Sequence, residues 1–372
     1  MSAVIIGIGT ASPAHQIDRE TATRVAQEMS STLPGQAKKI GALYRRSGIE
    51  SRGSVLLDDH QLQSFYPPAS SPEDRGPSTA CRSERYAQEA SKLAVASAQA
   101  ALANSSIDAS EITHLITVTC TGFSAPGIDI GLIDRLGLPA TTERVQVGFM
   151  GCHGAINAMR VARGLLAAQP NARILLCSVE LCSLHYQYGY NADRIVSGAL
   201  FADGSASLVL ASSDGDAAVS ETAQSKTTIG QIVATGSLLV PNSREMMTWK
   251  IGNHGYEMTL SANVPGLIES ELKGFLENWL AANGESLNSI GGWAVHPGGS
   301  RILTAVENAI GLSNDELAVS RAVLAQHGNM SSATMLYILQ RFAESNLAEA
   351  RPKPWLMLGF GPGLEIEVAL IR

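Results

Sequence analysis

One cysteine of this sequence occupies a position where a thiol is easily converted into a nucleophile. Cys152 lies in the glycine turn 151–154, after an apolar strand pattern and before the helical pattern of residues 155–162. The partial positive charge at a helix N-terminus favours the thiolate form of a nearby cysteine. The position therefore predicts a reactive thiol. A small buried residue packed at a strand–helix junction is the structural alternative.

A histidine and an asparagine occupy similar turns later in the chain. His296 ends a short apolar strand pattern that starts at Trp293, and Pro297 stops that strand. Asn329 lies in the turn 328–332, just before another helical pattern. Turns of this kind present side chains to a shared cavity. Each residue also has a structural alternative. His296 could be a strand-end histidine with all its hydrogen bonds made, and Asn329 could serve a left-handed turn. The three types together favour catalysis.

Composition limits the class of protein. The chain has 372 residues, of which 45% are hydrophobic and 16% charged, and its formal net charge is -7. These values predict a compact enzyme of about two domains and argue against nucleic acid as a partner. No run of 18 apolar residues and no basic N-terminal flank is present, so we expect a cytoplasmic protein without a membrane span. The five cysteines lack zinc-like spacing, so we expect free thiols and no metal.

The order of patterns along the chain indicates an internal duplication. A strand that runs into small residues and a proline occurs at 5–13 and again at 232–241. The turn 151–152 before a helix is repeated at 328–329, and the turn 201–204 before a strand is repeated at 360–363. We therefore predict an α/β fold of two similar halves, 1–218 and 219–372, with reactive turns from both halves meeting at the centre.

The sequence resembles the type III polyketide synthases, the chalcone-synthase-like branch of the thiolase superfamily. The resemblance covers essentially the whole chain and rests on four motifs, Gly151-Cys152, His296-Pro297-Gly298-Gly299, 328–332 and 359–364. It implies a thiolase-like fold in which two duplicated β-α halves pack as α-β-α-β-α layers. It also implies a homodimer that takes an acyl-CoA starter and malonyl-CoA as substrates and needs no cofactor.

The resemblance assigns a role to each reactive residue. Cys152 is the nucleophile that carries the acyl chain, while His296 and Asn329 promote decarboxylation of malonyl-CoA and hold the thioester oxygen. The residue types suit this chemistry, because a thiolate is both a nucleophile and a good leaving group. Two hydrogen-bond donors stabilise the negative charge that builds on the thioester oxygen. An imidazolium at His296 would also stabilise the Cys152 thiolate.

The resemblance further implies a substrate cavity with unusually little bulk. Gly230 and Met258 align with two gatekeeper phenylalanines of chalcone synthases, and Ala125 aligns with a methionine that crosses the dimer interface. The smaller side chains at these positions would leave room for a long aliphatic starter, and each buried methylene of that starter contributes about 0.8 kcal/mol. This points to an alkylresorcinol or alkylpyrone synthase. Gly230 could instead be a packing glycine in a strand. The complete set of expected cavity residues is Gly230, Met258, Cys120, Cys182, Ala125, Ser331, Gly361 and Pro362.

Coenzyme A is a polyanion, so its site requires local positive charge. A basic cluster comprises Lys38, Lys39, Arg45, Arg46 and Arg52, and the resemblance places CoA contacts in this region. We expect Arg46 to be the main contact, with Arg45 and Arg301 in support, although Glu50 stands where relatives carry another lysine. For Lys38 and Lys39 a solvated helix face is an equal alternative.

Three other functions share these residue types. A β-ketoacyl carrier-protein synthase of the third class also uses Cys, His and Asn, but it usually has Gln-Ala-Asn after its histidine, where this chain has Pro297-Gly298-Gly299. A Cys-His-Asn thiol hydrolase is disfavoured because no papain-like Cys-Gly-x-Cys-Trp segment is present. An inactive acyl-binding relative is disfavoured because all three reactive positions are filled.

Overall fold

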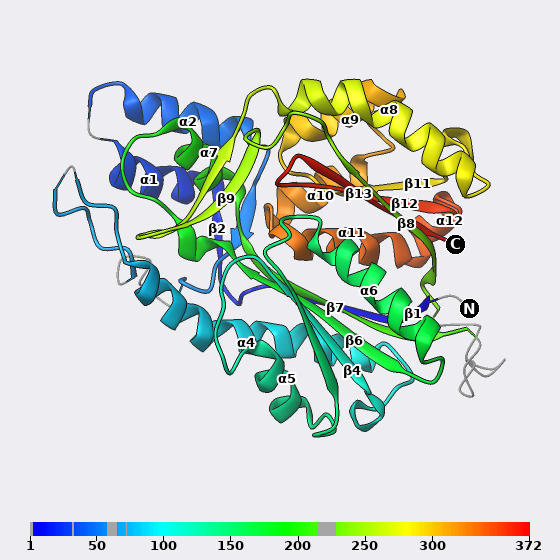
Figure 1. The fold of residues 1–372 in the computed structure, drawn as a ribbon. Coiled ribbons are helices and arrows are strands. Elements are labelled where there is room, and N and C mark those ends of the chain that lie inside the picture. The colour runs from blue at the N-terminus through cyan, green and yellow to red at the C-terminus, as the bar shows by residue number, and fades with distance from the viewer. Residues whose placement is uncertain (1–2, 32, 58–64, 72, 214–227) are drawn as a thin grey trace.

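A nine-stranded sheet forms the centre of the chain. The computed structural model describes residues 3–31, 33–57, 65–71, 73–213 and 228–372 (Figure 1). From one edge to the other the strands are β11 (Gly292–Val295), β12 (Trp355–Gly361), β13 (Glu365–Ile371), β8 (Gly230–Leu239), β1 (Ala3–Ala11), β7 (Asp203–Ser212), β6 (Arg173–Leu181), β4 (His114–Thr119) and β5 (Glu143–Gly148).

Four strands of each half follow the same order and β5 adds a ninth at one edge, which confirms the predicted duplication. In the first half β4 pairs with β6 in parallel, and β6, β7 and β1 follow in antiparallel order. In the second half β11 pairs with β12 in parallel, and β12, β13 and β8 follow in antiparallel order. Pairing of β1 with β8 joins the halves. The predicted boundary between residues 218 and 219 lies outside the described residues.

Helices cover both faces of each half and produce the expected α-β-α-β-α layers (Figure 1). The middle layer holds α6 (Gly154–Ala168) and α11 (Thr334–Ala343), whose buried faces share one core cluster with strands of both halves. The outer layer of the first half holds α4 (Thr79–Ala103) and α5 (Ile128–Leu136). The outer layer of the second half holds α8 (Val264–Ala282) and α9 (Ser300–Ile310).

The apolar patterns explain why these elements form and pack. In α8 the residues Val264, Ile268, Leu272, Leu276 and Leu280 recur every four positions, and all five are fully buried. This spacing places them on one face of the helix, against the sheet. By contrast, all nine residues of β6 are buried because this strand is covered by helices on both faces.

A smaller group of elements packs beside the layers. It comprises α1 (Arg19–Ser30), α2 (Gln36–Arg46), α7 (Ala192–Leu200), the pair β2 (Gln16–Asp18) and β3 (Ser51–Gly53), and the hairpin β9 (Met247–Gly252) and β10 (Gly255–Leu260). In Figure 1 this group lies at the upper left, and the helices α10 (Ala318–His327) and α12 (Ser345–Ala350) belong to the second half. Short 3-10 turns occupy Ala109–Glu111, Cys182–His185, Leu287–Ser289 and Ser331–Ala333. None of the described helices is long and apolar enough to cross a membrane.

Candidate active site

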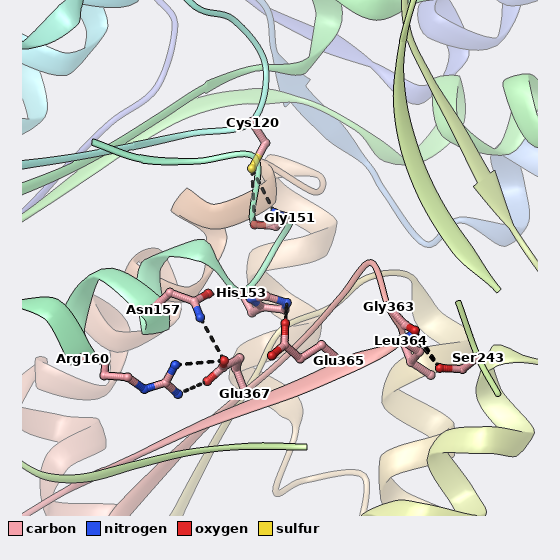
Figure 2. Close-up of polar contacts among 10 residues, drawn as sticks. All are labelled: Cys120, Gly151, His153, Asn157, Arg160, Ser243, Gly363, Leu364, Glu365 and Glu367. Carbon is pink, nitrogen blue, oxygen red and sulfur yellow. Dashed lines mark hydrogen bonds and ion pairs between the residues drawn. The ribbon is translucent and has the colours of Figure 1, made fainter. Parts of the chain in front are cut away.

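The turn that carries Cys152 connects β5 to α6. Cys152 lies two residues before the first residue of α6, so the cysteine precedes the helix instead of opening it. Gly151 adopts a φ of +89°, and a side chain there would collide with Pro362. The Gly151 backbone N–H donates a hydrogen bond to Cys120 Sγ over 3.1 Å (Figure 2). Glycine is therefore required at position 151 for both conformational and steric reasons.

Asn329 reaches the same turn from the second half. It follows α10 through Gly328, whose φ is +72°, and its backbone pairs with the strand end at Phe201. Its Oδ1 accepts a hydrogen bond from the backbone N–H of Ser331 over 2.8 Å. The side chains of Asn329 and Ser331 both lie near the Cys152 thiol and favour its thiolate form. The structure therefore brings two of the three predicted catalytic residues close together.

Burial dominates the electrostatics of Cys152. It raises the pKa of the thiol to about 12, although the side chains of Ser331 and Asn329 favour the thiolate. The negative charge of Glu180 raises this pKa further. The resting side chain is therefore a thiol at neutral pH, and the thiolate expected from the helix N-terminus is not the resting form. Formation of the nucleophile requires a proton acceptor within the site.

His296 is a buried imidazole with unused hydrogen-bonding capacity. It follows β11, and its backbone N–H bonds to the Leu358 carbonyl over 2.8 Å. Neither ring nitrogen has a hydrogen-bond partner among the described residues, and the side chain is 1% exposed. Burial lowers the pKa of His296 to about 3, with a smaller contribution from His153, so the ring is neutral at neutral pH. In the resting site, His296 is therefore not the imidazolium that would stabilise the Cys152 thiolate.

Cys152 opens into a small cavity, which we call the nucleophile cavity. Its volume is about 40 Å³. Five residues predicted for the substrate cavity line it, namely Cys120, Cys182, Met258, Ser331 and Pro362. Gly361 does not line it, because this glycine packs against the ring of His153 behind the turn. Ala125 is exposed and lies outside it, so the role of Ala125 at a dimer interface stays a prediction.

The prediction for Gly230 is wrong. Gly230 lies in the middle of the sheet, where it pairs with Ile5, and a Cβ atom there would lie 2.5 Å from Ile371 Cγ2. The C-terminal strand β13 therefore fills the space beside Gly230. Gly230 is therefore a packing glycine in a strand, as in the structural alternative for this position.

Sequence reasoning missed three residues around the cysteine. Phe201 and Trp249 line the nucleophile cavity, and Trp249 Nε1 donates to the Cys120 carbonyl over 2.8 Å. Glu180 is fully buried, accepts hydrogen bonds from the Cys120 backbone and from Thr121, and contacts Ser332. Burial raises the pKa of Glu180. A single carboxylate within the apolar pattern of β6 was the signal that could have identified it.

A second cavity adjoins the nucleophile cavity, and we call it the apolar cavity. It shares Cys182, Phe201 and Trp249 with the nucleophile cavity and has a volume of about 90 Å³. It extends between α1 and α2, where Ala22, Val25, Ala26, Met29, Tyr44, Leu56 and Leu57 line it. These side chains form an apolar wall, while Arg52, His185 and Arg194 also line the cavity.

A third cavity, the basic cavity, lies between α2, α7 and α9. Its volume is about 580 Å³, and both Arg46 and Arg301 line it. Its wall includes Gly298 and Gly299, directly after His296 and Pro297. Arg45 lies outside it, as do the exposed residues Lys38 and Lys39. Arg52 is used structurally, since it donates to the carbonyls of Gly198 and Phe201.

One cluster among the described residues has the composition of a metal site. Ligand atoms of His153, Glu365 and Glu367 lie within 4.8 Å of one another. Arg160 forms an ion pair with Glu367, and Asn157 donates to the same carboxylate over 2.9 Å (Figure 2). A cation would have to displace these donors, so the donor set does not favour a metal.

Comparison with known proteins identifies the family. The model of the N-terminal domain of chalcone and stilbene synthases matches residues 1–214, and that of the C-terminal domain matches residues 231–372. The alpha-pyrone synthesis polyketide synthase-like protein Pks18 of Mycobacterium tuberculosis is 31% identical over 98% of this chain and 90% of its own length. The 1,3,6,8-tetrahydroxynaphthalene synthase of Streptomyces peucetius subsp. caesius is 34% identical over 75% of this chain and 72% of its own length.

Solved structures agree with this result. PKS-I from the brown alga Ectocarpus siliculosus is 29% identical, with a TM-score of 0.89 over 100% of this chain and 98% of that one. The type III polyketide synthase domain of Steely1 from Dictyostelium is 25% identical, with a TM-score of 0.88 over 100% of this chain and 99% of that one. The chain belongs to the chalcone and stilbene synthase family and is a type III polyketide synthase, an acyltransferase that works by decarboxylative condensation.

Proposed function

We propose that this enzyme loads a long aliphatic acyl group from acyl-CoA onto Cys152 and extends it with malonyl-CoA. The observation that carries the proposal is the apolar cavity, which continues from the nucleophile cavity to the space between α1 and α2. Each methylene buried there contributes about 0.8 kcal/mol. The name of the mycobacterial relative refers to alpha-pyrone synthesis. An alkylpyrone or alkylresorcinol is therefore the proposed product.

Each reactive residue has a step in the proposed mechanism. The neutral ring of His296 accepts the Cys152 proton, and the thiolate then attacks the acyl-CoA carbonyl and releases CoA. Asn329 Nδ2 and a protonated ring nitrogen of His296 donate to the malonyl thioester oxygen as CO₂ leaves. The resulting carbanion attacks the acyl carbonyl on Cys152, the Cys152 thiolate leaves as the C–S bond breaks, and the extended chain is carried as a thioester of CoA. No step in this scheme uses a metal or a redox cofactor.

The basic cavity is the proposed CoA site. Arg46 and Arg301 line it and would bind CoA phosphates, while Gly298 and Gly299 place its wall beside His296. A CoA thioester bound there would direct its acyl end toward the catalytic residues. Arg45 lies outside this cavity and is not part of the proposed CoA site.

The cytoplasmic location expected from the sequence stays a prediction.

The exposed edge of the sheet is the proposed dimer interface. Beside the edge strand β5 lie four large apolar residues that are 36–40% exposed, Phe123, Val145, Phe149 and Met150. We call this set the edge patch. An edge strand with apolar side chains is a template for association, and Ala125 lies within two residues of Phe123. A second copy of the chain is the partner that the resemblance implied.

Narrowing the apolar cavity tests the proposed starter. Val25 lines this cavity and is only partly buried, so Val25→Phe would obstruct it with limited overpacking. We expect the ratio of kcat/KM for palmitoyl-CoA to that for acetyl-CoA to fall about tenfold, because loss of two methylene contacts costs about 1.6 kcal/mol. Val95→Phe in α4, outside the cavity, is the matched control. A folded Val25→Phe enzyme with an unchanged ratio would refute the long-chain starter.

A further inference from the structure

The residue after the nucleophile has its own polar network. His153 is the N-cap of α6 and is fully buried. Its Nδ1 lies 2.7 Å from Asn157 Oδ1, and Asn157 Nδ2 donates to Glu367 over 2.9 Å (Figure 2). A carboxylate only accepts, so it fixes the orientation of the Asn157 amide. Asn157 Oδ1 must then be the acceptor, and His153 Nδ1 must carry the proton.

The second nitrogen of this ring faces another carboxylate. His153 Nε2 lies 3.5 Å from Glu365 Oε2, and it has no hydrogen bond to any described residue. Two acceptors would repel each other at this distance, whereas a protonated Nε2 attracts the carboxylate. The two ring nitrogens therefore contact different elements, Asn157 on α6 and Glu365 on β13.

Charged side chains from two elements surround the ring. Glu365 and Glu367 extend from β13, and Arg160 on α6 forms an ion pair with Glu367. His153 is fully buried between them, whereas Glu365 is 26% exposed. The ring therefore links the start of α6 to the start of β13.

The network ties the nucleophile turn to the turn between β12 and β13. A side chain at Gly361 would collide with the His153 ring, and a Cβ at Gly359 would lie 2.9 Å from His153 Cβ. Pro362, next to Gly361, packs on Gly151 and lines the nucleophile cavity. Ser243 anchors the far side of this turn, since its hydroxyl donates to the Gly363 carbonyl over 3.0 Å and accepts from Leu364 N–H (Figure 2).

We propose that His153 is a positioning residue, which holds the Cys152 turn against the 361–363 turn through its polar contact with Glu365. Cys120 holds the same turn from the other side through Gly151. The two contacts flank Cys152 in sequence and limit the displacement of its Sγ. The inference rests on the proposed role of Cys152 as the nucleophile. A misplacement of about 1 Å can slow a reaction by up to about 10²-fold.

Glu365→Gln tests the contact directly. It removes the charge but keeps the size of a side chain that is 26% exposed. We expect acylation of Cys152 by an acyl-CoA, followed by mass spectrometry in a single turnover, to slow about tenfold, with KM for the thioester unchanged. His153→Phe should have at least the same effect. The double variant should be no slower than His153→Phe, because both changes break one contact.

The chain offers a matched control at the other end of the sheet. His114 Nε2 lies 3.6 Å from Glu143 Oε2, and His114 is also buried without a hydrogen bond from Nε2 to any described residue. This pair joins the starts of β4 and β5, away from the Cys152 turn. Glu143→Gln makes the same chemical change there and should leave the acylation rate within twofold of the wild-type rate.

Nitrogen NMR of labelled histidines reports on the contact. We expect the Nε2 resonance of His153 to shift in Glu365→Gln and to stay unchanged in Glu143→Gln. The inference is overturned by an unchanged His153 resonance in Glu365→Gln or by a wild-type acylation rate in that variant, even if it melts earlier. Multiplicative losses in the double variant also overturn it. Absence of an acyl adduct on wild-type Cys152 would instead refute the proposed nucleophile.

Discussion

At the scale of single residues, the site is distinguished by polar groups that are buried without complete hydrogen bonding. His296 leaves both ring nitrogens without a partner among the described residues, and such a group costs about 1–3 kcal/mol. A buried polar group without hydrogen bonds can persist in a native fold where a bound ligand supplies the missing hydrogen-bond partners. The Cys152 thiol, with its pKa raised to about 12, shows the same conflict between burial and charge. Both residues would therefore be stabilised by a ligand that supplies the missing partner.

The side chain of Asn329 has two separable roles, since its Nδ2 is the proposed oxyanion donor and its Oδ1 accepts a hydrogen bond within the turn. Asn329→Asp keeps the oxygen that accepts from the Ser331 N–H but replaces the amide donor with a carboxylate. We expect malonyl-CoA decarboxylation, measured by CO₂ release, to slow by about 10²-fold or more, because one oxyanion donor is lost. Acylation of Cys152 should slow much less. Equal losses in the two half-reactions would show that Asn329 acts on the fold of the turn instead.

At the scale of elements, the site is built from turns at the ends of strands and helices. Cys152 follows β5, His296 follows β11, and Asn329 follows α10. The backbone bridge between Phe201 and Asn329 holds a turn of the first half against a turn of the second. Turns placed on rigid strands can carry reactive groups precisely, while the layers behind them provide stability.

Two neighbouring arginines at the end of α2 test the assignment of the basic cavity. Arg46→Ala should raise KM for CoA thioesters about tenfold with little change in kcat, because a charge-assisted hydrogen bond contributes about 1.5 kcal/mol. Arg45→Ala removes the same charge one position away, outside the cavity, and should change KM less than twofold. Steady-state kinetics with malonyl-CoA distinguishes the two. Equal effects would indicate long-range charge instead of a contact.

At the scale of the whole molecule, one edge of the described sheet carries the exposed apolar residues of the edge patch. This edge is β5, the strand that leads to Cys152, so an interface there would also support the nucleophile turn. The pairing of β1 with β8 already satisfies the junction between the halves. Association of two copies would cover the edge patch and give the open edge a neighbour.

A charge within the edge patch tests the proposed dimer. Val145 is 39% exposed, so Val145→Lys should leave the subunit folded while opposing burial of the patch. Light scattering at micromolar concentration should show a dimer for the wild-type enzyme and a monomer for this variant. Leu239→Lys changes a more exposed residue at 64% outside the patch and should stay dimeric. A monomeric wild-type enzyme would refute the interface.

Local patterns explain how much the sequence determined by itself. The α/β class, the duplicated halves and the turns of Cys152, His296 and Asn329 follow from residue types and apolar periods along short segments, and the family follows from the resemblance of four short motifs. Such patterns are local, because a helix or strand is encoded by residues close in sequence. The motifs at 151–152, 296–299 and 328–332 were therefore recognisable before any contact was known.

Tertiary structure alone decided which residues share a cavity and how burial shifts the pKa of the buried groups. Gly230 was assigned to the cavity by alignment, but β13 packs beside it, and Phe201 occupies the cavity instead. The neutral state of His296 and the contact of His153 with Glu365 depend on burial and on strands far apart in sequence. Solvation and long-range packing are properties of the folded chain, because both depend on neighbours that the linear order does not specify.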